Sequence, residues 1–541
     1  MWLGTRAAAA AAIVISLLIA LPSFKLGFVT DDQGFRARLH LTSQPAWDSF
    51  AFQSGDPAEN TQLIRTGRLP WWSAPDLKIH FARPLTGELF ALDDSVFGDA
   101  AFGYHAHSLL WFVLLLVGVA AFYRRLLPLP AATLALLCFG LAGAHAQGYA
   151  WISARHVLVG AAGVAWALAL YIRTDSRWRW LALAPLLVGL LGSEAALGGV
   201  PLLCALAWTR GHRRDLVGLV AIGVAYVAVY AALGLGTHAS GGYHDPLHEP
   251  VAFLAVAVAR IPLLLGDGVA GVPVALGLTV VALMAIALFG VAWWLAVRGT
   301  ETFGLLVIAG LVALLPGVAG FPTGRVLIVP DLAFCAVLGV IIARARTSRV
   351  TLAFAVLFAL LRFAWAPLYS LGEMKELGRR GHRTDRIARE ALDLVPAGSR
   401  AVLVAASDPF VFLYPRAVAA ELSPHSITCW SVLSAAPASH LLTRTGEHAF
   451  TLEPRAPLLS GFDMLFRAPT RPFAVGDTVD QCGGTIRVDS VDSSGRPTKL
   501  AISYQRALDD PRLAFLVYRD GHLARFAFPA IGASVELTAG R

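Results

Sequence analysis

The chain has 541 residues, of which 56% are hydrophobic and 15% are charged, and its mean hydropathy is +0.63. A soluble protein of this size has too little interior for so much apolar surface, so the composition excludes an ordinary soluble enzyme and predicts extensive contact with lipid. The net charge of +8 reflects Lys and Arg, which gather in the cytoplasmic loops of membrane proteins. No aromatic-plus-basic RNA-binding motif occurs, and we expect no nucleic-acid partner.

Windows of about 17–25 apolar residues predict about eleven membrane spans. The first, in AAAAAAIVISLLIALPSF, lacks a small-residue cleavage site, so we expect it to stay in the protein as a span. The segment 251–265 is short and carries Arg260, and we expect it to lie at the outer interface or to re-enter the membrane. The expected spans lie near 7–28, 106–123, 131–149, 156–172, 178–193, 196–209, 215–235, 269–297, 303–320, 326–343 and 350–367.

Basic clusters fall on one side of these spans, which places the amino terminus in the cytoplasm. An odd number of spans then places the carboxyl-terminal part outside. We therefore predict a polytopic α-helical membrane protein. Its transmembrane domain covers 1–370 and includes a first outer loop, 29–105, and an extracytoplasmic soluble domain covers 371–541. The clusters comprise Arg6, Arg124, Arg125, Arg173, Arg177, Arg179, Arg210, Arg213, Arg214, Arg298, Arg344, Arg346 and Arg349.

The last part of the chain has a soluble pattern. A basic, helix-like stretch, 373–395, precedes the short runs RAVLVAAS, TIRVDSV, KLAISY and LAFLVY, which are separated by turn-forming residues. These runs predict a β-rich or α+β domain. Cys429 and Cys482 lie in this domain and can pair if it is outside the cytoplasm. The other cysteines, Cys138, Cys204 and Cys335, lie in apolar runs and are expected to be core residues.

Two adjacent acids follow the first span in FVTDDQGFRARL, residues 28–39. Asp31 and Asp32 can be solvated acids, or can cap a short helix that begins at Gln33. Alternatively, one carboxylate at the membrane surface can take the proton of an acceptor hydroxyl while a lipid-linked donor lies alongside. The two residues by themselves leave both interpretations open.

Other polar residues recur at the predicted outer surface. Arg83 precedes Pro84 at the start of an amphipathic pattern, and it can anchor a helix at the interface or bind phosphate through its guanidinium. Arg155 and His156 lie at a very short outer turn, and Arg325 is a second outward arginine. Glu194 lies between two closely spaced spans, where an acid is costly unless it is paired or faces a wet cavity.

Five stretches occur in an order that resembles the GT-C superfamily of polytopic glycosyltransferases, in particular the bacterial relatives of protein O-mannosyltransferases and tetratricopeptide-linked O-mannosyltransferases. They are TDD (30–32), the stretch from RPL to FGYH (83–105), WISARHVL (151–158), SEAALGGVPLL (193–203) and GRVLIVPDLAFCAVLG (324–339). The resemblance covers about residues 1–370 and implies a GT-C-like fold in the bacterial inner (cytoplasmic) membrane.

The resemblance also implies a function. A sugar would move by inversion from a polyprenyl-phosphate donor to an acceptor outside the cytoplasm, with Asp31 or Asp32 as the base and Asp31 favoured. Arg83, Arg155 and Arg325 would hold the lipid phosphate, and His105, His156 and Glu194 complete the expected binding residues. The sugar, hexose or pentose, and the protein, lipid or glycan acceptor stay open.

The sequence identifies no cofactor and leaves a divalent metal open, because the outer acids have no clear further ligand cluster. Two alternative functions are an inactive GT-C scaffold that binds lipid-linked sugar and a membrane transporter or flippase. A transporter is expected to carry ionisable residues in mid-span and helices broken by Gly or Pro in matched halves. The spans here are mostly Ala, Leu and Val.

Overall fold

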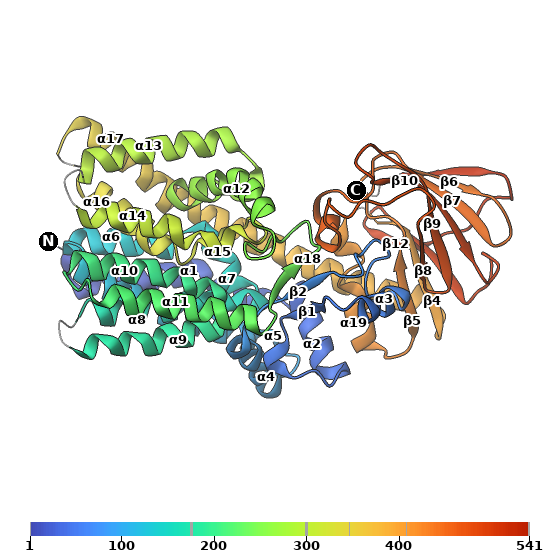
Figure 1. Cartoon of the computed structure of the whole chain (residues 1–541), viewed down its shortest axis with the longest axis horizontal. Coiled ribbons are helices and arrows are strands. Elements are labelled where there is room, and N and C mark those ends of the chain that lie inside the picture. Colours follow the sequence, from blue (N-terminus) through green and yellow to red (C-terminus); the bar gives the residue numbers. More distant parts are fainter. Residues whose placement is uncertain (1, 174–176, 298–300, 346, 407, 539–541) are drawn as a thin grey trace.

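A computed structural model of the protein describes residues 2–173, 177–297, 301–345, 347–406 and 408–538. A bundle of helices occupies one end of the molecule and a β-rich domain the other, with the amino terminus at the far end of the bundle and the carboxyl terminus in the β-rich domain (Figure 1). This arrangement confirms the expected polytopic helical protein with a carboxyl-terminal β-rich domain.

The bundle contains helices of very different lengths. They are α1 (Arg6–Ala20), α5 (Ala101–Leu126), α6 (Leu129–Gly140), α7 (Ala146–Ala150), α8 (His156–Tyr171), α9 (Leu183–Gly192), α10 (Gly199–Thr209), α11 (Asp215–Ala232), α12 (Pro250–Ala270), α13 (Thr279–Val297), α14 (Glu301–Ala313), α15 (Leu315–Val318), α16 (Asp331–Ala343), α17 (Arg349–Leu360) and α18 (Ala366–Leu394).

Among the described residues, eight helices are long and apolar enough to cross a membrane, or nine if the bent pair α6 and α7 forms one span. Three of the expected spans are instead shorter apolar helices, Trp178–Gly192, Glu194–Thr209 and Asp331–Ala343. We expected the segment 251–265 to lie at the outer interface or to re-enter the membrane. It instead belongs to the longer helix α12, which has the length and hydropathy of a span. Its Arg260 donates hydrogen bonds to the carbonyl oxygens of Gly242, Val318 and Gly320.

Helix α8 is the centre of the bundle, because 94% of the residues in its apolar stretch are buried inside the protein. It packs closely on α9 because small residues face each other: a Cβ on Gly163 would lie 2.6 Å from the Cα of Gly189. The 3₁₀ turn Ile152–Arg155 leads directly into α8. The central helix therefore gives that turn a fixed position at the end of the bundle nearest the β-rich domain.

The first outer loop is folded. It contains α2 (Asp31–Leu41), α3 (Pro57–Arg65) and α4 (Pro84–Phe97), and α4 confirms the amphipathic helix expected after Arg83. Strands β1 (Ala51–Ser54) and β2 (Lys78–His80) pair antiparallel, and β3 (Gly236–His238) adds to β2.

The β-rich domain has two sheets. One is six-stranded and antiparallel in the order β13-β6-β7-β10-β9-β8, and the other is four-stranded in the order β12-β11-β4-β5. All four runs that predicted strands form strands. The bounds are β4 (Ser399–Ala405), β5 (Ile427–Val432), β6 (His440–Arg444), β7 (Ala449–Pro454), β8 (Thr478–Gln481), β9 (Gly484–Val491), β10 (Pro497–Tyr504), β11 (Leu513–Arg519), β12 (His522–Arg525) and β13 (Ser534–Leu537), with helix α19 (Pro415–Leu422) after β4.

Two connections cross the domain boundary expected at residue 370. Helix α18 runs without a break from the bundle to the β-rich domain. The outer loop also enters the core of that domain: Trp71 and Trp72 are buried there, and the indole N–H of Trp71 donates to the carbonyl of Leu433 at 3.0 Å. The first outer loop and the β-rich domain thus form one packed unit.

The described cysteines confirm the expected pairing. Cys429 in β5 and Cys482 between β8 and β9 form a disulfide that joins the two sheets, and Cys138, Cys204 and Cys335 are free. The amide of Cys482 also donates to the carbonyl of Arg65, the last residue of α3. The disulfide therefore lies where the outer loop meets both sheets.

We predict that Cys429→Ser lowers the free energy of unfolding of this domain by about 2–4 kcal/mol, because the bridge restricts the unfolded chain. The measurement is the thermal denaturation midpoint of the detergent-solubilised protein, with Cys204→Ser as the control that leaves it unchanged. Denaturation without reductant should expose three alkylatable thiols in the wild-type protein. Alkylation of all five cysteines before reduction would contradict the bridge.

Candidate active site

The acid pair lies in a constrained turn at the start of α2. Thr30 has a φ of 50°, a conformation that residues other than glycine rarely adopt, and it is buried. Backbone hydrogen bonds from Asp32 to Val29 and from Gln33 to Thr30 close the turn. A strained residue persists only where its surroundings hold it, so the orientation of the two aspartates is determined by the fold.

Asp32 is fully buried and its carboxylate is surrounded by donors. Oδ2 accepts the amide N–H of Val29 at 2.9 Å, and Oδ1 accepts the amide N–H of Ser153 at 2.7 Å together with the Ser153 hydroxyl. These contacts attach α2 to the 3₁₀ turn at the head of α8. Asp32 therefore links two segments that are 121 residues apart.

Asp31 is only partly buried and faces the β-rich domain. Its Oδ1 accepts a hydrogen bond of 2.7 Å from the hydroxyl of Tyr414, which immediately precedes α19. Within the described part of the chain, no hydrogen bond reaches Oδ2 of Asp31. Of the two carboxylates, Asp31 is therefore the one with an oxygen left for an incoming group.

Arg325 supplies a positive charge beside Asp31. It lies in the 3₁₀ turn Gly324–Leu327 before α16, and its guanidinium lies 4.7 Å from the ring centroid of Trp151. Its charge acts on both Asp31 and Tyr414. No hydrogen bond or ion pair joins this guanidinium to another residue that the structure describes, so its N–H groups remain available for an anion.

Arg83 and Glu194 form an ion pair near the same place. Two nitrogens of Arg83 donate to the two oxygens of Glu194, Nε to Oε2 at 2.8 Å and the second at shorter range, and the guanidinium packs on the rings of Phe50 and Phe81. The ion pair explains how Glu194, an acid between two closely spaced spans, is stabilised there. Arg83 still acts electrostatically on Asp31, although Glu194 offsets much of its charge.

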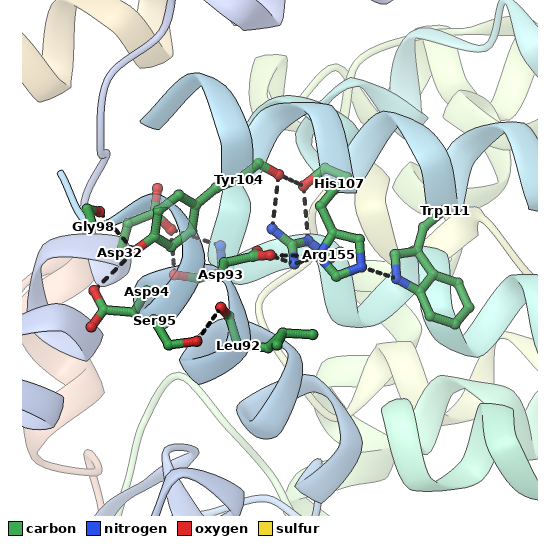
Figure 2. A network of polar contacts seen from close by, with 12 residues as sticks. Asp32, Leu92, Asp93, Asp94, Ser95, Gly98, Tyr104, His107, Trp111 and Arg155 are labelled. Carbon is green, nitrogen blue, oxygen red and sulfur yellow. Dashed lines mark hydrogen bonds and ion pairs between the residues drawn. The ribbon is translucent and has the colours of Figure 1, made fainter. Parts of the chain in front are cut away.

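Arg155 belongs to a different group, which Figure 2 shows from close by. Its guanidinium pairs with Asp93 of α4 at 2.5 Å and donates to the Ser108 hydroxyl and the Tyr104 carbonyl. Asp93 also contacts Nδ1 of His107 at 2.6 Å. Arg155 is 1% exposed. These contacts use its donors within the protein, so the guanidinium holds α4 and α5 to the turn that carries Ser153.

The two histidines expected at the site are both buried. Nδ1 of His156 lies 3.0 Å from the hydroxyl of Ser193, the residue before Glu194, and its ring packs against Phe50. Nε2 of His105 lies 3.4 Å from the carbonyl oxygen of Gly27, directly before the turn of the acid pair. His156 thus lies beside the Arg83 pair, and His105 lies behind the aspartates.

Burial raises the pKa of both aspartates. For Asp31 the hydrogen bond from Tyr414 and the charges of Arg325, Arg38 and Arg83 oppose that rise, but the pKa stays above its ordinary value. For Asp32 burial raises the pKa to about 7, against the opposing hydrogen bonds from Ser153 and Val29. A carboxylate with a raised pKa is a stronger base than one in water, which suits proton abstraction.

Two of the three carboxylates at the site already have protein partners on both oxygens. Both oxygens of Asp32 accept hydrogen bonds from Ser153 and Val29, and both oxygens of Glu194 accept from Arg83. Across the described residues, no three His, Cys, Asp or Glu side chains are grouped so that they could hold a metal ion. Asp32 and Glu194 are therefore matched to protein donors and a cation, whereas Oδ2 of Asp31 stays open.

The expected residues therefore separate into three groups. Asp31, Arg325, Arg83 and Glu194 come together, with His156 beside them; Asp32 and His105 lie behind Asp31; and Arg155 lies in the Asp93 network. Tyr414 and Arg38 were not expected. The sequence could have indicated Arg38, since it lies two turns after Asp31 on a short helix. Nothing in the sequence around Tyr414, FVFLYPR, indicates that it belongs to the site.

No family model and no curated protein matches the chain. Solved structures similar to it include the oligosaccharyltransferase of Archaeoglobus fulgidus, tethered with an acceptor peptide (12% identity, 80% of this chain, TM-score 0.41), of which the chain spans 64%. Another is ArnT from Cupriavidus metallidurans bound to undecaprenyl phosphate (15% identity, 78% of this chain and 89% of that chain, TM-score 0.37).

Proposed function

We propose that the protein is a membrane glycosyltransferase that moves a sugar from a polyprenyl-phosphate donor to a hydroxyl-bearing acceptor. The observation that supports this most is the open oxygen of Asp31 within the electrostatic reach of Arg325, whose guanidinium has no hydrogen-bond partner among the described residues. A base and a free cation at one end of an apolar helical bundle are what a lipid-phosphate leaving group and a hydroxyl nucleophile require.

The chemistry is a single displacement. Asp31 takes the proton of the acceptor hydroxyl, the acceptor oxygen bonds to the anomeric carbon of the sugar, and the bond from that carbon to the phosphate oxygen breaks. Attack from the face opposite the phosphate inverts the anomeric centre. Arg325 stabilises the negative charge that develops on the departing phosphate, since guanidinium presents several donors to phosphate oxygens.

The surrounding residues hold these two groups in place. Asp32 and Ser153 connect α2 to the head of α8, and the Arg83–Glu194 pair joins the start of α4 to the turn between α9 and α10. Such fixed positions lower the barrier because the reacting groups need no reorganisation. We further propose that this face lies outside the cytoplasm, as the basic loops of the sequence indicate.

Replacing the base is the first test. We expect Asp31→Asn to lower kcat for sugar transfer by about 10²–10⁴, because the amide cannot accept the proton. The measurement is transfer of radiolabelled sugar from polyprenyl-phosphate donors in membranes that contain the purified protein. Asp99→Asn is the matched control, because Asp99 is an exposed acid of the same loop. Wild-type rates in Asp31→Asn would remove Asp31 from the mechanism.

Removing the free cation should weaken binding of the lipid phosphate. Hydrogen bonds to charged groups contribute about 1.5–3 kcal/mol, so Arg325→Ala should raise the Kd for undecaprenyl phosphate roughly ten- to hundredfold. Equilibrium binding to the detergent-solubilised protein measures this. Arg379→Ala, which removes an exposed arginine of α18, should leave the Kd unchanged. Equal affinities of wild type and Arg325→Ala would show that the phosphate binds elsewhere.

The transfer rate should depend on pH through Asp31. The carboxylate must be ionised to accept a proton, and its pKa lies above the ordinary 3.8, so the rate should fall as the pH is lowered through that raised value. The acid limb should therefore have its midpoint above pH 3.8. Enzyme returned from low pH to neutral pH must recover its rate, which separates titration from unfolding. A rate that stays constant down to pH 4 would contradict the assignment.

A further inference from the structure

We propose that Tyr414 of the β-rich domain is a positioning residue for Asp31, so that this domain completes the active site. The inference rests on the proposed function, because it concerns the same carboxylate. Tyr414 and Asp31 are 383 residues apart, and the phenol hydroxyl donates to Oδ1 of Asp31 at 2.7 Å. The contact directs the second oxygen of Asp31 away from Tyr414 and leaves it for the acceptor.

The β-rich domain is attached to α2 at two further points. Nε2 of Gln33 donates to Oδ1 of Asp385 in α18 at 2.7 Å. Nδ1 of His40 lies 3.1 Å from Oε1 of Glu421 in α19, while its Nε2 lies 2.9 Å from Oδ2 of Asp94 in α4. Contacts along the length of α2 hold this helix and the domain in one relative position.

The Tyr414 ring is itself held by aromatic neighbours. It stacks on Phe410 with the centroids 6.1 Å apart, and Phe410 lies 5.6 Å from Phe462 and under the guanidinium of Arg380. Phe462 stacks in turn on Phe321, four residues before Arg325. The aromatic residues thus run from Asp31 to the segment that carries Arg325, and they link the β-rich domain to both reacting positions.

The hydrogen bond also changes the chemistry of the base. Tyr414 and Arg325 both stabilise the ionised form of Asp31 against burial. Loss of the phenol hydroxyl should therefore leave Asp31 protonated over a wider pH range and free its carboxylate to rotate. Both effects lower the fraction of molecules in which the base is ionised and correctly oriented, and neither touches the Arg325 guanidinium.

The test compares Tyr414→Phe with the wild type and with Tyr504→Phe, which removes a phenol hydroxyl from the core of the same domain. The first readout is independent of activity. Carbodiimide modifies protonated carboxyls, so mass spectrometry of Asp31 labelling across pH gives its titration. We expect the Tyr414→Phe curve to move to higher pH by roughly one unit, and the Tyr504→Phe curve to match the wild type.

The second readout is kinetic. Tyr414→Phe should lower kcat by roughly tenfold and move the acid limb of the rate to higher pH, while the Kd for undecaprenyl phosphate stays within about twofold. An unchanged Asp31 titration, or an unchanged kcat, would overturn the proposal. A higher kcat would also overturn it, because the phenol would then obstruct the acceptor. If the wild type transfers no sugar, the proposed function fails, and the Asp31 titration still decides whether Tyr414 controls this carboxylate.

Discussion

The hydrogen bonds between Asp32 and Ser153 are the contact on which the candidate site depends. A carboxylate that is fully buried is costly unless donors surround it, and here two donors come from the turn at the head of the most buried helix. The same turn continues to Arg155, whose charge is matched by Asp93 (Figure 2). One short segment therefore orients α2 through Ser153 and the α4–α5 pair through Arg155.

The adjacent aspartates have different environments because they lie on different sides of one strained turn. Asp32 points inward, where every oxygen has a protein donor, and Asp31 points toward the β-rich domain with one oxygen open. A conformation that is unfavourable for Thr30 is maintained by these bonds. The resemblance favours Asp31 over Asp32, and the structural distinction between them is the set of donors from which Asp32 already accepts hydrogen bonds.

Hydropathy predicted most of the fold, because a helix that faces lipid can be recognised from a local run of apolar residues. The long runs of α5 and α11 fall at the expected places, whereas α13 begins at Thr279, ten residues after the expected start of its span. The alternating runs of β4, β9, β10 and β11 are strands. What local pattern could not predict is the route of the outer loop. Trp71 and Trp72 belong to the first outer loop, but they are buried in the core of a domain formed some 360 residues later. Only tertiary packing decides such a partner.

The same reasoning explains which site residues were accessible to prediction. Arg325 and Arg83 stand out because arginine is uncommon on the expected outer side of the spans. Their difference is a matter of partners: Glu194 is 111 residues from Arg83 and pairs with it, and no described residue pairs with Arg325. Arg155 carries an equally strong local signal and is satisfied by Asp93. A charge at a membrane surface thus marks a candidate, and the presence or absence of a protein counter-charge decides whether it can serve a ligand. By that criterion, among the candidate residues that the structure describes, the guanidinium of Arg325 and the open oxygen of Asp31 are the groups that we propose to act on a ligand.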